Sequence, residues 1–274
     1  MTEKTLNNRK NGLVVLLLLV LVYVASVVLF IFGVSYDILP LTLISCVWFV
    51  FGWIFFLGLK VLKPQEALVL TLFGKYVGTL KNSGFYFVNP FCTAVNPAAG
   101  TKLNQSGDVK VLGAKQPSGG VDVSIDIPTK KISLKIMTLN NNRQKINDCL
   151  GNPVEIGIAV MWRVVDTAKA VFNVDNYKEY LSLQCDSALR NIVRIYPYDV
   201  APNVDTTGDG IADEGSLRGS SEVVAERIRN EIQQRVEDAG IEVIEARITY
   251  LAYAPEIAAV MLQRQQASAI IDAR

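Results

Sequence analysis

Two apolar runs decide how this chain folds: LVVLLLLVLVYVASVVLFIF at residues 13–32 and LTLISCVWFVFGWIFFLGL at residues 41–59. Each is about as long as the roughly 20 apolar residues that cross a bilayer. Backbone groups in hydrocarbon must bond internally, so both runs are predicted to be helices. The break at residues 33–40 is too short for a domain. The chain is therefore expected to enter the membrane, turn and return to the side it came from.

The break contains Gly33, Ser35, Asp37 and Pro40, and Asp37 is the only charge between residues 13 and 59. Proline suits the first turn of a helix, where its missing N–H removes no hydrogen bond, so Pro40 is expected to open the second helix. Two alternatives stay open. The first run resembles a signal peptide in position, although it exceeds the usual 7–15 residues and no A-x-A site follows it. The hairpin could also be re-entrant, since only one carboxylate would then be buried.

Basic residues predict the orientation of the hairpin, because they favour the cytoplasmic side. They occur before the first run and after the second, and the connecting break has none. Both termini are therefore predicted to be cytoplasmic, in a multi-pass protein of the cell membrane. The flanking basic residues are Lys4, Arg9, Lys10, Lys60, Lys63, Lys75 and Lys81.

Composition argues against several functions. The 274 residues include 27 basic and 26 acidic side chains, whereas a nucleic-acid binder would normally carry a basic face. The chain has no histidine, which excludes Ser-His and Cys-His catalysis and the commonest zinc sites. It has neither a P-loop nor a G-x-G-x-x-G after a strand. We therefore expect no enzyme and no cofactor, although hydrolysis by Asp, Glu or Lys remains a rival hypothesis.

The four cysteines are too far apart to form a metal-binding pair. With the folded part on the cytoplasmic side they are expected to be reduced and structural. They are Cys46, Cys92, Cys149 and Cys185.

After residue 60 the pattern is first strand-like and then helical. Residues 66–91 predict a small antiparallel sheet beginning at the membrane surface, and residues 92–122 a long loop. Strict alternation of apolar and polar residues predicts further strands. Ser221 is expected to cap a helix that Gly240 closes. The expected later elements are strands at 121–127, 131–139, 144–149 and 154–165, helices at 166–171, 177–195 and 221–239, a strand at 241–251 and a last helix from Pro255. Strands followed by helices indicate an α+β fold with an antiparallel sheet.

Several short segments together resemble the SPFH (band 7) family of stomatins, prohibitins and flotillins. They are PQEALV at 64–69, NSGFYFVNPF at 82–91, GNPVEIG at 151–157, WRVVD at 162–166, EARITYLAYAPEI at 245–257 and MLQRQQA at 261–267. The expected organisation is a cytoplasmic tail at residues 1–12 and a transmembrane helical hairpin at 13–62. The resemblance, which covers residues 63–274, implies that an SPFH-like domain at 63–253 and the start of a long helix at 254–274 follow. The loop at 92–122 is longer than the family's usual connection, and most of the family's coiled coil is missing from this sequence.

The resemblance also implies a function. Family members are non-enzymatic, anchor in membrane lipid, form large homo-oligomers and organise membrane microdomains. The chain is therefore expected to be an oligomeric scaffold. The alternative is a regulatory subunit that acts one-to-one on a membrane protease or channel.

Three sets of residues are candidate sites. Asp205, Asp209 and Asp213, with Gly210 between them, match part of a calcium loop, but Ser216 stands where the bidentate Glu is needed, and an ordinary turn fits as well. A mixed-charge helix and the last helix supply candidate subunit contacts, against the alternative of a solvated face. Aromatic and basic residues after the second run are candidate membrane-surface contacts, against the alternative of sheet core. The subunit-contact set is Glu222, Glu226, Arg229, Arg235, Met261, Gln265 and Ile270, and the membrane-surface set is Lys60, Lys63, Phe85, Phe87 and Phe91.

Overall fold

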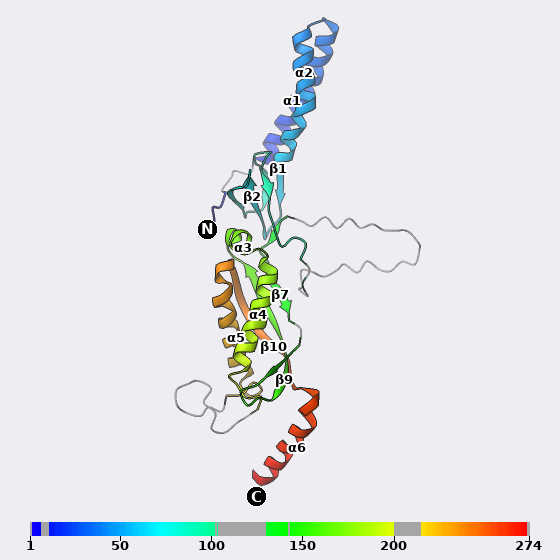
Figure 1. Cartoon of the computed structure of the whole chain (residues 1–274). Coiled ribbons are helices and arrows are strands. Elements are labelled where there is room, and N and C mark those ends of the chain that lie inside the picture. The colour runs from blue at the N-terminus through cyan, green and yellow to red at the C-terminus, as the bar shows by residue number, and fades with distance from the viewer. Residues whose placement is uncertain are drawn as a thin grey trace, which may run out of the picture. The chain divides into compact units, whose positions relative to one another are not determined.

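The computed structural model describes residues 2–6, 11–101, 103, 130–141, 143–199 and 215–272, apart from the side chains of 264, 265 and 267–272. Contacts divide it into two compact units (Figure 1). The first comprises Met1–Ala99, Ile127–Lys135 and Thr167–Phe172, and the second Gly100–Asp126, Ile136–Asp166 and Asn173–Arg274. The predicted strand at 121–127 lies outside the described residues. The predicted domain boundaries at 63 and 253 stay a prediction.

A helical hairpin begins the first unit. Helices α1 (Gly12–Ser35) and α2 (Leu39–Phe51) lie side by side, and Pro40 falls in the first turn of α2, as predicted. The second run is not one continuous α-helix, because it narrows after Phe51 into the 3-10 helix η1 (Gly52–Gly58). Glycine is a poor α-helix former, and 3-10 turns are frequent at helix ends. Gly12–Ser35 and Leu39–Gly58 are each long and apolar enough to cross a membrane.

Two small antiparallel sheets follow directly. Strand β1 (Leu59–Leu62) pairs with β4 (Gly84–Phe87). Strand β2 (Glu66–Leu72) pairs with β3 (Lys75–Leu80), β5 (Thr93–Ala94) and β6 (Ile132–Ser133). The short helix α3 (Thr167–Phe172) packs on β2. The core of this unit is formed by Leu62, Leu68, Leu70, Leu80, Tyr86, Val88 and Cys92.

The second unit is built on one long strand. On one edge of β9 (Pro153–Val164) lies β10 (Ile241–Tyr253), and along its other edge lie β7 (Met137–Asn140) and β8 (Gln144–Asn147). Helices α4 (Tyr177–Val193) and α5 (Ser221–Val236) pack against each other beside this sheet (Figure 1). The predicted inward face of β9 is confirmed, since Ile156, Ile158, Val160 and Trp162 are all buried. The predicted α+β class is confirmed as well.

Three local predictions differ from the structure. The single strand expected at 131–139 is split, because the chain pairs with β2 at β6 and then leaves that sheet to pair with β9 at β7. Ser221 is not a cap, because it is the first helical residue and Ser220 before it makes no side-chain cap bond. The helix becomes the 3-10 turn η3 (Glu237–Ala239) after Val236, and Gly240 closes it in the left-handed region at φ 65°, as expected. The last helix, α6 (Pro255–Asp272), begins where predicted.

Candidate anchoring and assembly surfaces

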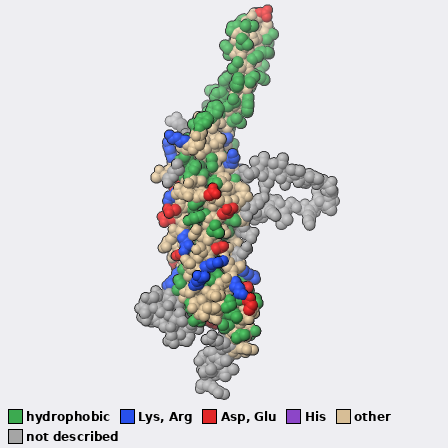
Figure 2. Space-filling model, viewed as in Figure 1, with side chains coloured by type: hydrophobic (Ala, Val, Ile, Leu, Met, Phe, Trp, Pro, Cys, Tyr) green, Lys and Arg blue, Asp and Glu red, His purple; other side chains and the backbone are tan. Residues whose placement is uncertain are grey.

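Small residues allow the two helices of the hairpin to approach closely. The buried positions of α1 are Gly12, Leu19, Ser26 and Gly33, spaced by seven residues, and Ser45 is the buried residue of α2. A seven-residue spacing keeps one line of side chains facing a neighbouring helix. Small side chains favour packing between membrane helices. The large apolar side chains point outward, so Figure 2 shows an almost entirely hydrophobic surface over both helices. The hairpin therefore offers lipid a continuous apolar surface.

The hairpin joins the sheet without a linker. Val88 donates its backbone N–H to the Gly58 carbonyl at 2.9 Å, so the β1–β4 ribbon starts where η1 ends. A Cβ added to Gly12 would lie 2.7 Å from the Phe85 carbonyl carbon, and one on Gly58 would collide with Val88. Both glycines are therefore needed for the close contact between helices and ribbon. The contact places the β1–β4 ribbon at the base of the hairpin.

Of the predicted membrane-surface residues, Lys60, Phe85 and Phe87 lie in this ribbon and are half-buried, while Lys63 and Phe91 are exposed. Phe91 stacks on Phe73, with ring centroids 6.5 Å apart, although the two rings are 59% and 88% exposed. Phe73 has φ 48° at the β2–β3 turn, which is unfavourable for a bulky residue.

The strand register places the exposed aromatic pair near the hairpin. Phe87 pairs with Leu59, the first residue after η1, so β4 runs back toward the base of the helices. Phe91 follows β4 within a few residues, and the pairing of Thr71 with Thr93 brings the end of β2 to the same edge. Sequence reasoning missed Phe73. It could have been noticed, because an aromatic residue is unusual in a two-residue turn, where Asn-Gly is favoured.

The N-terminal segment is bound to β3, in the other sheet of the first unit. Thr79 donates its backbone N–H to the Lys4 carbonyl at 2.8 Å and accepts from the Leu6 N–H at 2.9 Å, so this segment adds a short parallel bridge to the edge of β3. The Glu3 carboxylate binds the Lys81 ammonium at 2.6 Å and the Thr167 hydroxyl at 2.5 Å. The chain before α1 and the chain after η1 therefore lie on one side of the hairpin.

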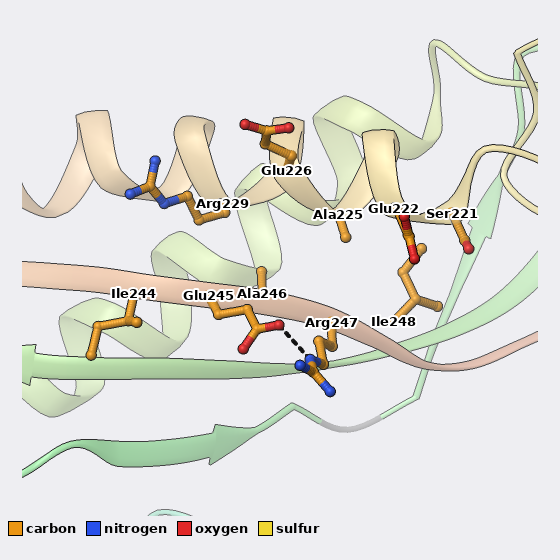
Figure 3. A pocket seen from close by; sticks show the side chains of 10 residues that line it. All are labelled: Ser221, Glu222, Ala225, Glu226, Arg229, Ile244, Glu245, Ala246, Arg247 and Ile248. Carbon is orange, nitrogen blue, oxygen red and sulfur yellow. Dashed lines mark hydrogen bonds and ion pairs between the residues drawn. The ribbon is translucent and has the colours of Figure 1, made fainter.

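The second unit contains a groove of about 700 Å³ between α5 and β10 (Figure 3). Its lining includes three of the predicted subunit-contact residues, Glu222, Glu226 and Arg229. Arg229 donates to the Val243 carbonyl at 3.2 Å, and Gln233 accepts from the Val243 N–H at 2.7 Å. These two side chains satisfy the backbone hydrogen-bonding groups of Val243 on the free edge of β10, near the start of the strand. The groove continues along the same edge from Ile244 to Ile248.

The groove has a mainly polar lining that includes acidic side chains. Its apolar lining includes Ile244 and Ile248, and Arg247 is already paired with Glu245. Glu222 points toward β10, whereas Glu226 points away from it (Figure 3). Within the described part of the chain, neither Glu222 nor Glu226 has an ion pair. Two uncompensated carboxylates on an exposed surface favour binding of a cationic partner.

The remaining predicted contacts fall elsewhere. Arg235 binds Glu231 of its own helix at 2.6 Å and donates to Ser187 of α4 at 2.9 Å, so it is committed within the unit. Met261 is half-buried on α6, and the side chains of Gln265 and Ile270 lie outside the described residues. Asp205, Asp209 and Asp213 also lie outside them. Among the residues that are described, no cluster of three metal-ligating side chains occurs.

Local electrostatics agree with structural roles for several groups. Burial raises the pKa of the Cys185 thiol, and Asp186 raises it further, which keeps this thiol protonated. Burial likewise raises the pKa of Cys149, with a further contribution from Asp148. Thiols with raised pKa values are poor nucleophiles.

These features define a membrane-associated α+β protein of two units, the first of which carries its sheets at the base of a helical hairpin. A family model described as SPFH domain / Band 7 family matches residues 60–274, so the chain belongs to that family and the predicted resemblance is confirmed. Members are generally membrane-associated scaffolds or regulators and generally non-enzymatic. No curated protein matches the chain.

Proposed function

We propose that the chain is a non-enzymatic scaffold that assembles as a large homo-oligomer on the cytoplasmic face of the cell membrane. Its assembly would gather lipid and neighbouring membrane proteins into a defined patch. The family assignment supports a scaffold or regulatory role, and the open groove of the second unit supports assembly through protein contacts.

One observation carries the proposal. The N-terminal segment bonds to β3, and α1 and η1 contact the β1–β4 ribbon, so contacts on both sides of the hairpin hold the first unit at its base. Every copy is thereby fixed at one height relative to the bilayer. Confinement to a plane raises the effective concentration of neighbouring copies, so weak lateral contacts suffice for a large assembly.

The mass of the native protein tests this function. The full-length protein is extracted from its own membranes in mild detergent and its mass is measured by light scattering. A homo-oligomer of many copies is expected. A strict monomer contradicts the proposal, and a defined complex with one protease or channel favours the alternative of a regulatory subunit.

Labelling with a membrane-impermeant maleimide tests the topology. With the parent protein subtracted as background, Asp37→Cys is expected to be labelled in intact cells and Lys63→Cys only after permeabilisation. If Asp37→Cys is protected in intact cells, the hairpin is re-entrant or inverted. If Lys63→Cys is labelled in intact cells, the cytoplasmic placement is wrong.

A further inference from the structure

We infer that the α5–β10 groove of one copy binds the α4–β8 flank of a second copy of this chain in a head-to-tail contact. The inference rests on the proposed function, since it names the surfaces that would join neighbouring scaffold subunits. It concerns only the second unit.

The two surfaces lie on opposite flanks of this unit. β10 occupies one edge of β9 along nearly its whole length, so β7 and β8 must pair with the other edge. Arg229 of α5 binds the backbone of β10, and Arg190 of α4 binds Gln144 of β8 at 3.2 Å. Each helix therefore borders a different edge. Contact between opposite flanks of identical subunits is heterologous and closes into a ring or patch when the rotation permits.

The charges on the two flanks are complementary. Glu222 and Glu226 are exposed on the α5 side, and Arg190 and Arg194 are exposed on the α4 side. Arg190 binds the neutral Gln144, whose amide in turn donates to the Asp186 carboxylate of α4, so Arg190 is linked to a carboxylate only through this side chain. Arg194 has no ion pair among the residues that the structure describes. Both flanks thus expose charged side chains that form no ion pair with any residue in the described part of the unit.

The complementary charges lie at the same end of the helix pair. Tyr180, near the start of α4, donates to the Arg235 carbonyl at 3.0 Å, and Ser187, farther along α4, accepts from the Arg235 guanidinium at 2.9 Å. Because Arg235 is in the last turn of α5, the two helices run antiparallel. The C-terminal half of α4, with both exposed arginines, is therefore level with the N-terminal half of α5, with both exposed glutamates. Copies arranged side by side would bring the two charge pairs together without a large shift.

Exposed apolar residues accompany the charges. Ile195 follows Arg194 in the chain and is 44% exposed. On α5, Val223 follows Glu222 and is 53% exposed. On the groove side, Ile244 is also exposed. An apolar centre with a charged rim is typical of protein interfaces. Such a contact can be modest in area, because the membrane hairpin already holds the copies together.

Charge reversal in the full-length protein tests the contact. The acidic-flank variant E222K/E226K would set lysines against the neighbour's arginines, and the basic-flank variant R190E/R194E would set glutamates against glutamates. Each alone is expected to lower the association constant at least about tenfold, because juxtaposed like charges are strongly unfavourable. All four residues are exposed, and circular dichroism checks that the fold is unchanged. The matched control E237K/D238K changes the charge equally at the other end of α5 and should keep the wild-type mass.

Two combinations make the test specific. The chain with all four reversals should regain the wild-type assembly, since opposite charges face each other again. Co-expressed copies of the two double variants should also assemble, in alternation, although neither does so alone.

The possible failures are distinguishable. If each double variant keeps the wild-type mass, or if the four-fold reversal does not restore it, the interface is wrong and the scaffold proposal still stands. If the variants keep their mass but lose a co-purifying protein, the groove binds a different partner and the inference is overturned. If the wild-type protein is itself a monomer, both the inference and the proposed function fail.

Discussion

The Glu3 carboxylate is expected to hold the N-terminal segment on the sheet, and Glu3→Ala tests this. Glu3 is only 13% exposed and accepts bonds from the Lys81 ammonium at 2.6 Å and from the Thr167 hydroxyl and N–H at 2.5 and 3.2 Å. A hydrogen bond to a charged group contributes about 1.5–3 kcal/mol. The Lys81 pair is discounted because Lys81 is 25% exposed. Removal should therefore favour release of the segment by about 2–3 kcal/mol.

Amide hydrogen exchange measures this release. The Leu6 and Thr79 amides report it, because each is bonded across the junction between the segment and β3. An opening free energy lowered by 2–3 kcal/mol corresponds to exchange that is about 30- to 150-fold faster. The control Glu179→Ala removes an exposed carboxylate from α4 and should leave both amides unchanged. Unaltered exchange in Glu3→Ala would show that the carboxylate does not secure the segment.

Three further predictions follow from individual groups. Ile228→Ala removes a fully buried α5 side chain and should cost about 2–5 kcal/mol of unfolding free energy in urea titrations of the detergent-solubilised protein; a loss below about 1 kcal/mol would contradict its core position. Burial raises the pKa of Glu66, but hydrogen bonds from the Lys131 ammonium and the Lys63 backbone outweigh burial and lower it below 4.5. The ionised Glu66 carboxylate therefore stabilises the fold above pH 4.5, and this stabilisation is lost as pH falls through the lower folded pKa. Glu66→Gln should flatten the acid limb of a plot of unfolding free energy against pH. An unchanged acid limb would refute the assignment. Burial raises the pKa of Cys185, so its maleimide labelling at pH 8 should require urea, and rapid labelling of the folded protein would contradict its burial.

Individual helices and strands could be predicted, because each depends on the local hydrophobic period and composition of its own segment. The apolar runs predicted the hairpin, Pro40 its second helix, and alternation at residues 154–165 the buried face of β9. Gly240 marked a helix end because a left-handed residue costs least without a Cβ. The family resemblance was readable for the same reason, as a set of short segments in fixed order.

The candidate surfaces were only partly predictable. The charge pattern on α5 indicated Glu222 and Glu226, but it indicated Arg235 equally, and only packing against α4 shows that Arg235 is committed. The seven-residue spacing from Gly12 through Ser26 to Gly33 was present in the sequence and was missed. The pairing of Glu3 with Thr167 had no sequence signal, since their separation in the chain gives no local cue.

The sequence by itself determined that the chain has two membrane-length helices, an α+β folded part and membership of the SPFH domain / Band 7 family. These properties follow from hydrophobic period, length and local turn chemistry. Only the tertiary structure decided that the N-terminal segment joins the sheet, that Phe73 meets Phe91, and that α5 leaves an open groove along β10. Each of these depends on which distant segments pack together. The interior packing of both units selects that arrangement, and no local pattern in the chain encodes it.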